Sequence, residues 1–194
     1  MTTNLLERVT QHFEESVQVK TKAAPLLAPI ILEASHTLAN SLKKGHKILI
    51  CGNGGSAADA QHFSGELLNQ LELKRPSLPG ITLTADASTI TAIGNDYSFD
   101  EVFAKQVHAL GQAGDVLVGI TTSGNSKNVL RAIEEAHTRG LSVIALTGRD
   151  GGKIPAILQA NDIEIRIPSD RTIRIQEIHI LVIHCLCDLI DQQL

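Results

Sequence analysis

A histidine and a glutamate stand four residues apart in the segment ILICGNGGSAADAQHFSGEL, which spans residues 48–67. Residues 57–72 are predicted to form a helix, on which His62 and Glu66 face the same side. An imidazole beside a carboxylate can transfer protons, or it can bind a divalent metal ion. A lone histidine is more often structural, so this pair indicates a site only where a ligand-binding loop lies beside it.

The loop before this helix, residues 52–57, matches the pattern G-x-G-x-x-A that binds dinucleotides after a first strand. Two features oppose a dinucleotide site. The acidic residue expected about 20 residues later is missing, because Asp86 lies well past that spacing, and two predicted helices precede the first strand. Taken alone, the loop is equally consistent with a tight turn that binds nothing.

A second loop, TTSGNS at residues 121–126, places four hydroxyl groups around a glycine where a helix is predicted to begin. Free backbone N–H groups at a helix N-terminus, together with hydroxyls, form an anion site without any lysine or arginine. Helix capping explains Ser126 but not the other three hydroxyls. We therefore predict a site for a phosphate monoester.

Hydrophobic periodicity indicates the elements that position these loops. Helices are predicted over residues 3–22 and 26–44, which Pro25 separates, and over 57–72, 88–94, 99–110, 126–139, 151–159 and 172–192. Strands are predicted over residues 47–51, 81–84, 115–120, 142–148 and 162–167. This alternation predicts an α/β fold, a five-stranded parallel sheet flanked by helices in three layers of the flavodoxin-like or Rossmann-like kind. Ligands bind such sheets beyond the carboxyl ends of the strands.

We expect a single domain over residues 1–194, with an N-terminal helical pair for oligomerisation at 1–45 and an α/β core at 46–194. The formal net charge is −4 and no basic run is present, which argues against nucleic acid as a partner. No apolar run reaches the length of a membrane span. The three cysteines (Cys51, Cys185 and Cys187) resemble small core residues of a reducing compartment, and we expect a cytoplasmic protein.

Five segments in order (CGNGGSAADAQHF, GNDYSF, GITTSGNS, ALTGRDGG and RIQEIHILVIH) resemble the sugar isomerase (SIS) domain family and, within it, the bacterial phosphoheptose isomerases. The resemblance covers essentially the whole chain. It implies conversion of sedoheptulose 7-phosphate to D-glycero-D-manno-heptose 7-phosphate through an enediol, on the pathway to ADP-heptose and the lipopolysaccharide core. It also implies a homotetramer with pockets near subunit interfaces and one zinc ion per subunit.

The same resemblance assigns roles to particular residues. It implies that Glu66 is the catalytic base and His184 its acid partner. The implied metal ligands are His62, Glu66, Gln176 and His184. The implied substrate contacts are Asn53, Gly54, Gly55, Ser56, Glu66, Asn95, Asp96, Thr121, Thr122, Ser123, Ser126 and Gln176.

Some positions leave alternatives open. Gln176 and His184 are eight residues apart, about 12 Å along a helix, so they can share an ion only by converging on it from two sides. Without the resemblance, Asn95 and Asp96 would be taken for a plain turn. Some phosphoheptose isomerases carry an acid at the position of Ile173, and we do not transfer its role to Asp170. His179 is expected to be structural, and the remaining histidines (His12, His36, His46, His108 and His137) to be surface or packing residues.

A non-catalytic relative that binds the replication initiator DnaA is the main alternative, because RPSLP, DEVFAKQV, ALGQAGDVL and HCLCDLID resemble that protein too. The relative lacks the carboxylate at the position of Glu66 and the imidazole at the position of His184. This chain keeps both, which favours the enzyme. A dinucleotide-dependent oxidoreductase is a remote third possibility.

Overall fold

The computed structural model describes residues 4–194 and contains a five-stranded sheet in the order β2-β1-β3-β4-β5. All neighbouring strands are parallel, as predicted. The strands are β1 Ile48–Gly52, β2 Gly80–Thr82, β3 Val116–Ile120, β4 Ser142–Gly148 and β5 Ile163–Ile167. Every residue of β1 and β3 is buried, because helices cover both faces of the sheet.

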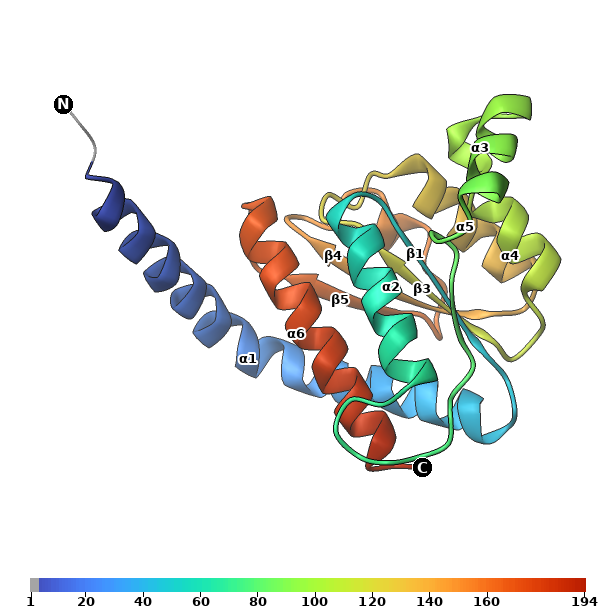
Figure 1. Cartoon of the computed structure of the whole chain (residues 1–194), viewed down its shortest axis with the longest axis horizontal. Coiled ribbons are helices and arrows are strands. Elements are labelled where there is room, and N and C mark those ends of the chain that lie inside the picture. Colours follow the sequence, from blue (N-terminus) through green and yellow to red (C-terminus); the bar gives the residue numbers. More distant parts are fainter. Residues whose placement is uncertain (1–3) are drawn as a thin grey trace.

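Six α-helices surround this sheet in residues 4–194 (Figure 1). They are α1 Leu5–Lys43, α2 Gly55–Leu68, α3 Ala87–Asp96, α4 Ala104–Leu110, α5 Lys127–Thr138 and α6 Thr172–Asp191. Two short 3₁₀ turns, η1 Phe99–Glu101 and η2 Ile154–Ala156, stand where longer helices were predicted. None of the helices that the structure describes combines the length and the apolar character needed to cross a membrane.

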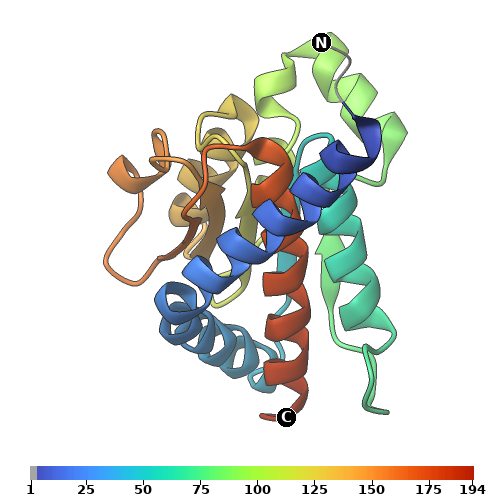
Figure 2. The same ribbon diagram turned by 90° about the vertical axis from the view of Figure 1, so that its left-hand side faces the viewer.

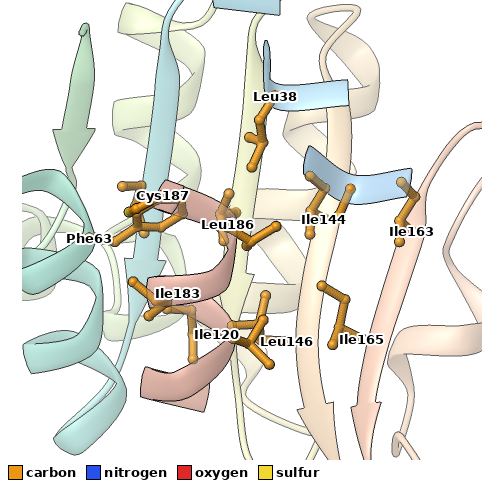
Figure 3. Packing of buried hydrophobic residues seen from close by; sticks show 14 of the residues in the cluster. Leu38, Phe63, Ile120, Ile144, Leu146, Ile163, Ile165, Ile183, Leu186 and Cys187 are labelled. Carbon is orange, nitrogen blue, oxygen red and sulfur yellow. The ribbon is translucent and has the colours of Figure 1, made fainter. Parts of the chain in front are cut away.

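One face of the sheet is covered by α1, α2 and α6. Leu38 from α1, Phe63 from α2 and Leu186 from α6 are fully buried in one cluster with the strand residues Ile144 and Leu146 (Figure 3). Figure 2 shows α2 and α6 side by side on this face, with α1 crossing α6. The opposite face is covered chiefly by α4 and α5, in a second cluster that includes Leu49, Val107, Leu117, Val129 and Ile133.

The N-terminal region differs from the prediction of two helices at 3–22 and 26–44. Leu5–Lys43 is one helix with Pro25 and Pro29 inside it, and the predicted start at residue 3 lies outside the described residues. A proline in a helix interior removes one backbone hydrogen bond and costs about 3 kcal/mol. The buried residues of α1 lie around and after the prolines, Ala23, Leu27 and Leu38 among them, and pack this part of the helix against the body, so packing outweighs this cost. Figure 1 shows that the helix changes direction part way along.

Candidate active site

Helices α2 and α6 bring together two imidazoles that are 122 positions apart in the chain. Nε2 of His62 lies 2.9 Å from Nε2 of His184, with the rings edge to face. Oε1 of Glu66, one turn further along α2, lies 3.4 Å from the same His62 nitrogen. His62 is two-fifths exposed and Glu66 about one-fifth exposed, so solvent reaches the group. The structure therefore brings His62, Glu66 and His184 together, three of the four residues that the resemblance implies as metal ligands.

Gln176 approaches the glycine-rich loop instead. A Cβ atom on Gly55 would lie 2.4 Å from Nε2 of Gln176, so only glycine leaves room for this amide. Gly54 has a positive φ of 57°, which lets the chain turn from β1 into α2 without strain. Since α2 and α6 run side by side, Gln176 lies beside the start of α2 and His184 beside its third turn. Ser56, predicted to contact substrate, is buried at 4% exposure.

The positions of His62, His184 and Glu66 can be compared with those of ligands around a metal ion. A tetrahedral ion with bonds of about 2.1 Å holds neighbouring ligand atoms roughly 3.4 Å apart. The His62–Glu66 separation of 3.4 Å matches that spacing, and the His62–His184 separation of 2.9 Å is shorter than it. As the side chains stand, no three His, Cys, Asp or Glu residues within 4–194 are gathered closely enough to form a metal-binding cluster.

The hydroxyl-rich loop lies at the carboxyl end of β3, beside the glycine loop, because Gly52 of β1 pairs with Ile120 of β3. Oγ1 of Thr121 and Oγ of Ser126 are 3.0 Å apart. Ser126 occupies the N-cap position of α5, yet its side chain makes no capping hydrogen bond. Capping therefore does not account for this hydroxyl. Thr122 and Ser123 are half-buried in the same loop.

The TGRDGG segment at residues 147–152 packs against the hydroxyl-rich loop. Gly124 has a positive φ of 66° and packs directly on the backbone of Gly151, and the N–H of Lys153 donates to the Gly124 carbonyl. The Gly151 backbone leaves no space for a side chain at Gly124, and a Cβ atom on Gly152 would lie 2.5 Å from the Ser123 carbonyl oxygen. The shape of the hydroxyl-rich loop is thus fixed by the TGRDGG segment after β4.

Asn95 and Asp96 differ from the expectation of a plain turn. They form the end of α3 rather than a plain turn, and both are exposed. Nδ2 of Asn95 donates to Oδ1 of Asp96 at 2.9 Å, and within residues 4–194 this is the only side-chain hydrogen bond of either residue. The structure does not bring them against the His62–His184 pair. Ile173 and Asp170 are also exposed, at the start of α6 and just before it.

Three further residues at the site were not identified from the sequence. Asp59 lies one turn before His62 on the same face of α2, and its Oδ2 is buried without a hydrogen-bond partner. Burial raises the pKa of the Asp59 carboxyl, and the nearby His62 lowers it. The i, i+3, i+7 spacing of Asp59, His62 and Glu66 was the available signal. Asn128 and Arg75 act through contacts between distant segments, which no local spacing reveals.

The residues expected to be structural behave as such. His179 is fully buried and its Nε2 lies 3.0 Å from the Thr147 carbonyl oxygen; burial lowers the pKa of this imidazole to about 4. Burial also raises the pKa of the Cys51 and Cys187 thiols to about 12, as expected for unreactive core cysteines. His137 packs against Asp162, with its Nε2 2.7 Å from the carboxylate.

The chain is similar to known proteins over nearly its whole length. The family model described as "SIS domain" matches residues 11–148. A phosphoheptose isomerase from Coxiella burnetii (strain RSA 493 / Nine Mile phase I) is 59% identical over 191 residues, which cover 98% of this chain and 96% of that protein.

Two solved structures have the same fold. Phosphoheptose isomerase GmhA from Neisseria gonorrhoeae is 54% identical, with a TM-score of 0.93 over 97% of this chain and 100% of that one. A phosphoheptose isomerase from Francisella tularensis is 50% identical, with a TM-score of 0.96 over 98% of this chain and 100% of that one.

Proposed function

The chain belongs to the SIS domain family, and from that premise we propose that it is an aldose–ketose isomerase that converts sedoheptulose 7-phosphate to D-glycero-D-manno-heptose 7-phosphate. The observation that carries this proposal is the approach of His184 to His62, which itself lies 3.4 Å from Glu66 on the helix that follows the glycine loop. The names of the similar proteins supply the substrate class, and the arrangement of an acid beside a base supplies the chemistry.

The reaction moves a proton between adjacent carbon atoms through an enediol. Glu66 removes a proton from C1 of the ketose while His184 donates one to the carbonyl oxygen at C2, which gives the enediol. Glu66 then returns its proton to C2 and His184 recovers one from the oxygen on C1, which leaves the aldehyde of the aldose. Glu66 and His184 both return to their starting protonation states, so no external acid or base is consumed.

We further propose one zinc ion per subunit, held by His62, Glu66, Gln176 and His184. When bound, the ion would polarise the substrate carbonyl and the adjacent hydroxyl. An amide oxygen is the least usual of these ligands. A carboxylate held tightly by a cation is a weak base, so Glu66 needs a loose contact with the ion to serve in proton transfer.

Substrate binding divides between the two loops. The hydroxyls of Thr121, Thr122, Ser123 and Ser126, with the N–H groups at the start of α5, hold the phosphate. Asn53 and the backbone of Gly54 and Gly55 contact the sugar, with Ser56 supporting the turn. A cavity of about 140 Å³, lined in part by Gly52, Asn53, Gly54 and Thr84, opens beside this loop. Asn95 and Asp96 contact the sugar hydroxyls in this proposal, and Ile90 of the same helix α3 lines the cavity.

A homotetramer is part of this proposal. The outer half of α1 exposes an apolar stripe, in which Leu6, Val9, Phe13 and Val17 are between 53% and 75% exposed. A second apolar surface, a groove of about 260 Å³ between α1 and α6, is lined by residues such as Leu27, Ile31 and Leu181. Apolar surfaces of this kind are typical of subunit contacts. A cytoplasmic location and a role in the pathway to ADP-heptose and lipopolysaccharide complete the proposal.

The test is turnover of sedoheptulose 7-phosphate by the purified protein, with and without a chelator, together with metal analysis. We expect the aldose product, loss of activity on chelation, recovery with zinc, and one zinc per chain. Glu66→Gln keeps the shape of the side chain and should lower kcat by about 10²–10⁴-fold while retaining the fold. Glu33→Gln, on the exposed side of α1, is the matched control.

Absence of product both with and without the chelator would overturn the proposed activity. Near-normal turnover by Glu66→Gln would overturn only the assignment of the base. Tight binding to the replication initiator in an inactive protein would favour the non-catalytic alternative, for which the structure offers no specific observation.

A further inference from the structure

Two asparagines from neighbouring loops form a closed pair of hydrogen bonds. Nδ2 of Asn53 donates to Oδ1 of Asn128 at 2.8 Å, and Nδ2 of Asn128 donates to Oδ1 of Asn53 at 2.8 Å. Asn53 directly follows β1, and Asn128 is the second residue of α5. Because β1 and β3 are adjacent strands, their following segments meet at one edge of the sheet.

The pair fixes the orientation of both amides. Turning either amide alone by 180° would oppose two N–H groups at one contact and two oxygens at the other. Asn128 is buried at 3% exposure, whereas Asn53 is half-buried. Each amide keeps one N–H and one oxygen lone pair that take no part in the two reciprocal hydrogen bonds. Only those of the half-buried Asn53 are open to a ligand. Asn128 thus presents Asn53 to the cavity in one orientation.

The same residue belongs to the helix end that faces the phosphate. The backbone N–H of Asn128 lies in the first turn of α5, where N–H groups have no partner within the helix. Its side chain holds the residue that we assign to the sugar, and its backbone lies in the segment that we assign to the phosphate. The reciprocal hydrogen bonds therefore connect the two halves of the binding site.

We propose that Asn128 is a positioning residue. It holds the Asn53 amide at a fixed distance from the phosphate loop, so that the sugar and the phosphate group of one substrate molecule can bind at the same time. This inference rests on the proposed role of Asn53 in binding the sugar. Asn128 itself touches neither the sugar nor the reacting atoms. Its loss should weaken substrate binding without changing the chemical step.

The experiment compares Asn128→Ala with the unaltered protein in two measurements, steady-state turnover of sedoheptulose 7-phosphate and inhibition by inorganic phosphate. We expect KM to rise about tenfold, as expected for the loss of one or two neutral hydrogen bonds, with kcat nearly unchanged. The inhibition constant of inorganic phosphate should stay the same, because phosphate alone does not reach Asn53. Asn161→Ala, at an exposed turn before β5, is the control.

A double-mutant cycle separates positioning from general destabilisation. Asn53→Ala alone should raise KM, and adding Asn128→Ala to it should raise KM no further. Asn128→Ser replaces Asn128→Ala if the latter fails to fold, with the same expected result.

Three results would overturn the inference. Additive effects of the two substitutions would mean that Asn128 acts independently of Asn53. A parallel loss of inorganic phosphate binding would mean that Asn128 supports the phosphate loop instead. An unchanged KM in Asn53→Ala would remove the sugar contact on which the inference rests, although turnover by the unaltered protein would leave the isomerase function standing.

Discussion

Arg75 connects the end of α2 to the end of α6, and its replacement by alanine should destabilise the fold strongly. Its guanidinium donates to the backbone carbonyls of Glu66 and Leu67 at 2.8 Å each, and its Nε donates to the carboxylate of Asp191. The Arg75 and Asp191 side chains are only 9% and 3% exposed. Arg75→Ala would leave a buried carboxylate without its cation and the end of α2 with one carbonyl unpaired.

The size of the effect follows from these contacts. Breaking a buried ion pair by removing one partner costs about 3–5 kcal/mol. The Glu66 carbonyl also loses its donor, which adds about 1 kcal/mol, whereas the Leu67 carbonyl still accepts from the Leu78 N–H at 2.9 Å. Water entering beside Asp191 recovers part of this, so we expect a total of about 3–5 kcal/mol. For a chain of this size, that corresponds to a fall in Tm of roughly 10 °C.

Thermal and urea unfolding at one fixed protein concentration measure this loss, because the stability of an oligomer depends on concentration. Arg131→Ala is the matched control: its ion pairs to Glu101 and Glu134 are on the surface, and its side chain is 47% exposed. We expect the control to lose less than about 1 kcal/mol. If Arg75→Ala lost no more than Arg131→Ala, the contacts of Arg75 would not carry the stability assigned to them.

Three other predictions concern the phosphate loop, the buried histidine and self-association. Ser126→Ala should raise KM about tenfold with little change in kcat, since its hydroxyl makes no capping hydrogen bond and can bind the phosphate beside its partner, the Thr121 hydroxyl; steady-state kinetics would contradict this with an unchanged KM. Burial lowers the pKa of His179 from 6.5 to about 4, so the unfolded chain binds a proton at a higher pH than the folded chain does. The free energy of unfolding should therefore fall by about 3 kcal/mol as the pH is lowered from 6.5 to 4. His179→Gln should flatten this acid dependence in unfolding experiments, and an unaltered slope would count against it. Phe13→Asp places a charge in the exposed stripe of α1 and should yield a smaller species in sedimentation; an unchanged mass would show that the stripe is no subunit contact.

Much of the sheet could be predicted from local patterns. The strand at 142–148 has the same bounds in the structure, and the other four strands shift by at most two residues at either end. These strands are recognisable because apolar runs bounded by glycine and polar residues are buried on both faces. The single helix α1 was missed because Pro25 is a strong local stop signal, and only contacts with α6 and the sheet overcome it.

At the site, the same division holds. Residue types, loop chemistry and the four-residue spacing of His62 and Glu66 were evident from the sequence, since they depend on neighbours within one turn or one loop. The partner of His62 was suggested only by resemblance, because residues 62 and 184 meet solely through the packing of α2 against α6. At Asn95 and Asp96 the local pattern indicated a plain turn, whereas the two residues form the exposed end of α3.

The sequence by itself determined the class of fold and the chemistry available to it, because periodicity, glycine positions and hydroxyl clusters act over short stretches of chain. Only the tertiary structure decided which groups meet. The approach of His184 to His62, the reciprocal amides of Asn53 and Asn128, and the burial of Arg75 against Asp191 all join segments separated by 75 residues or more. Such contacts depend on the order of the strands and the packing of the helices. These are set by hydrophobic packing across the whole core, so the local sequence around either residue does not reveal its partner.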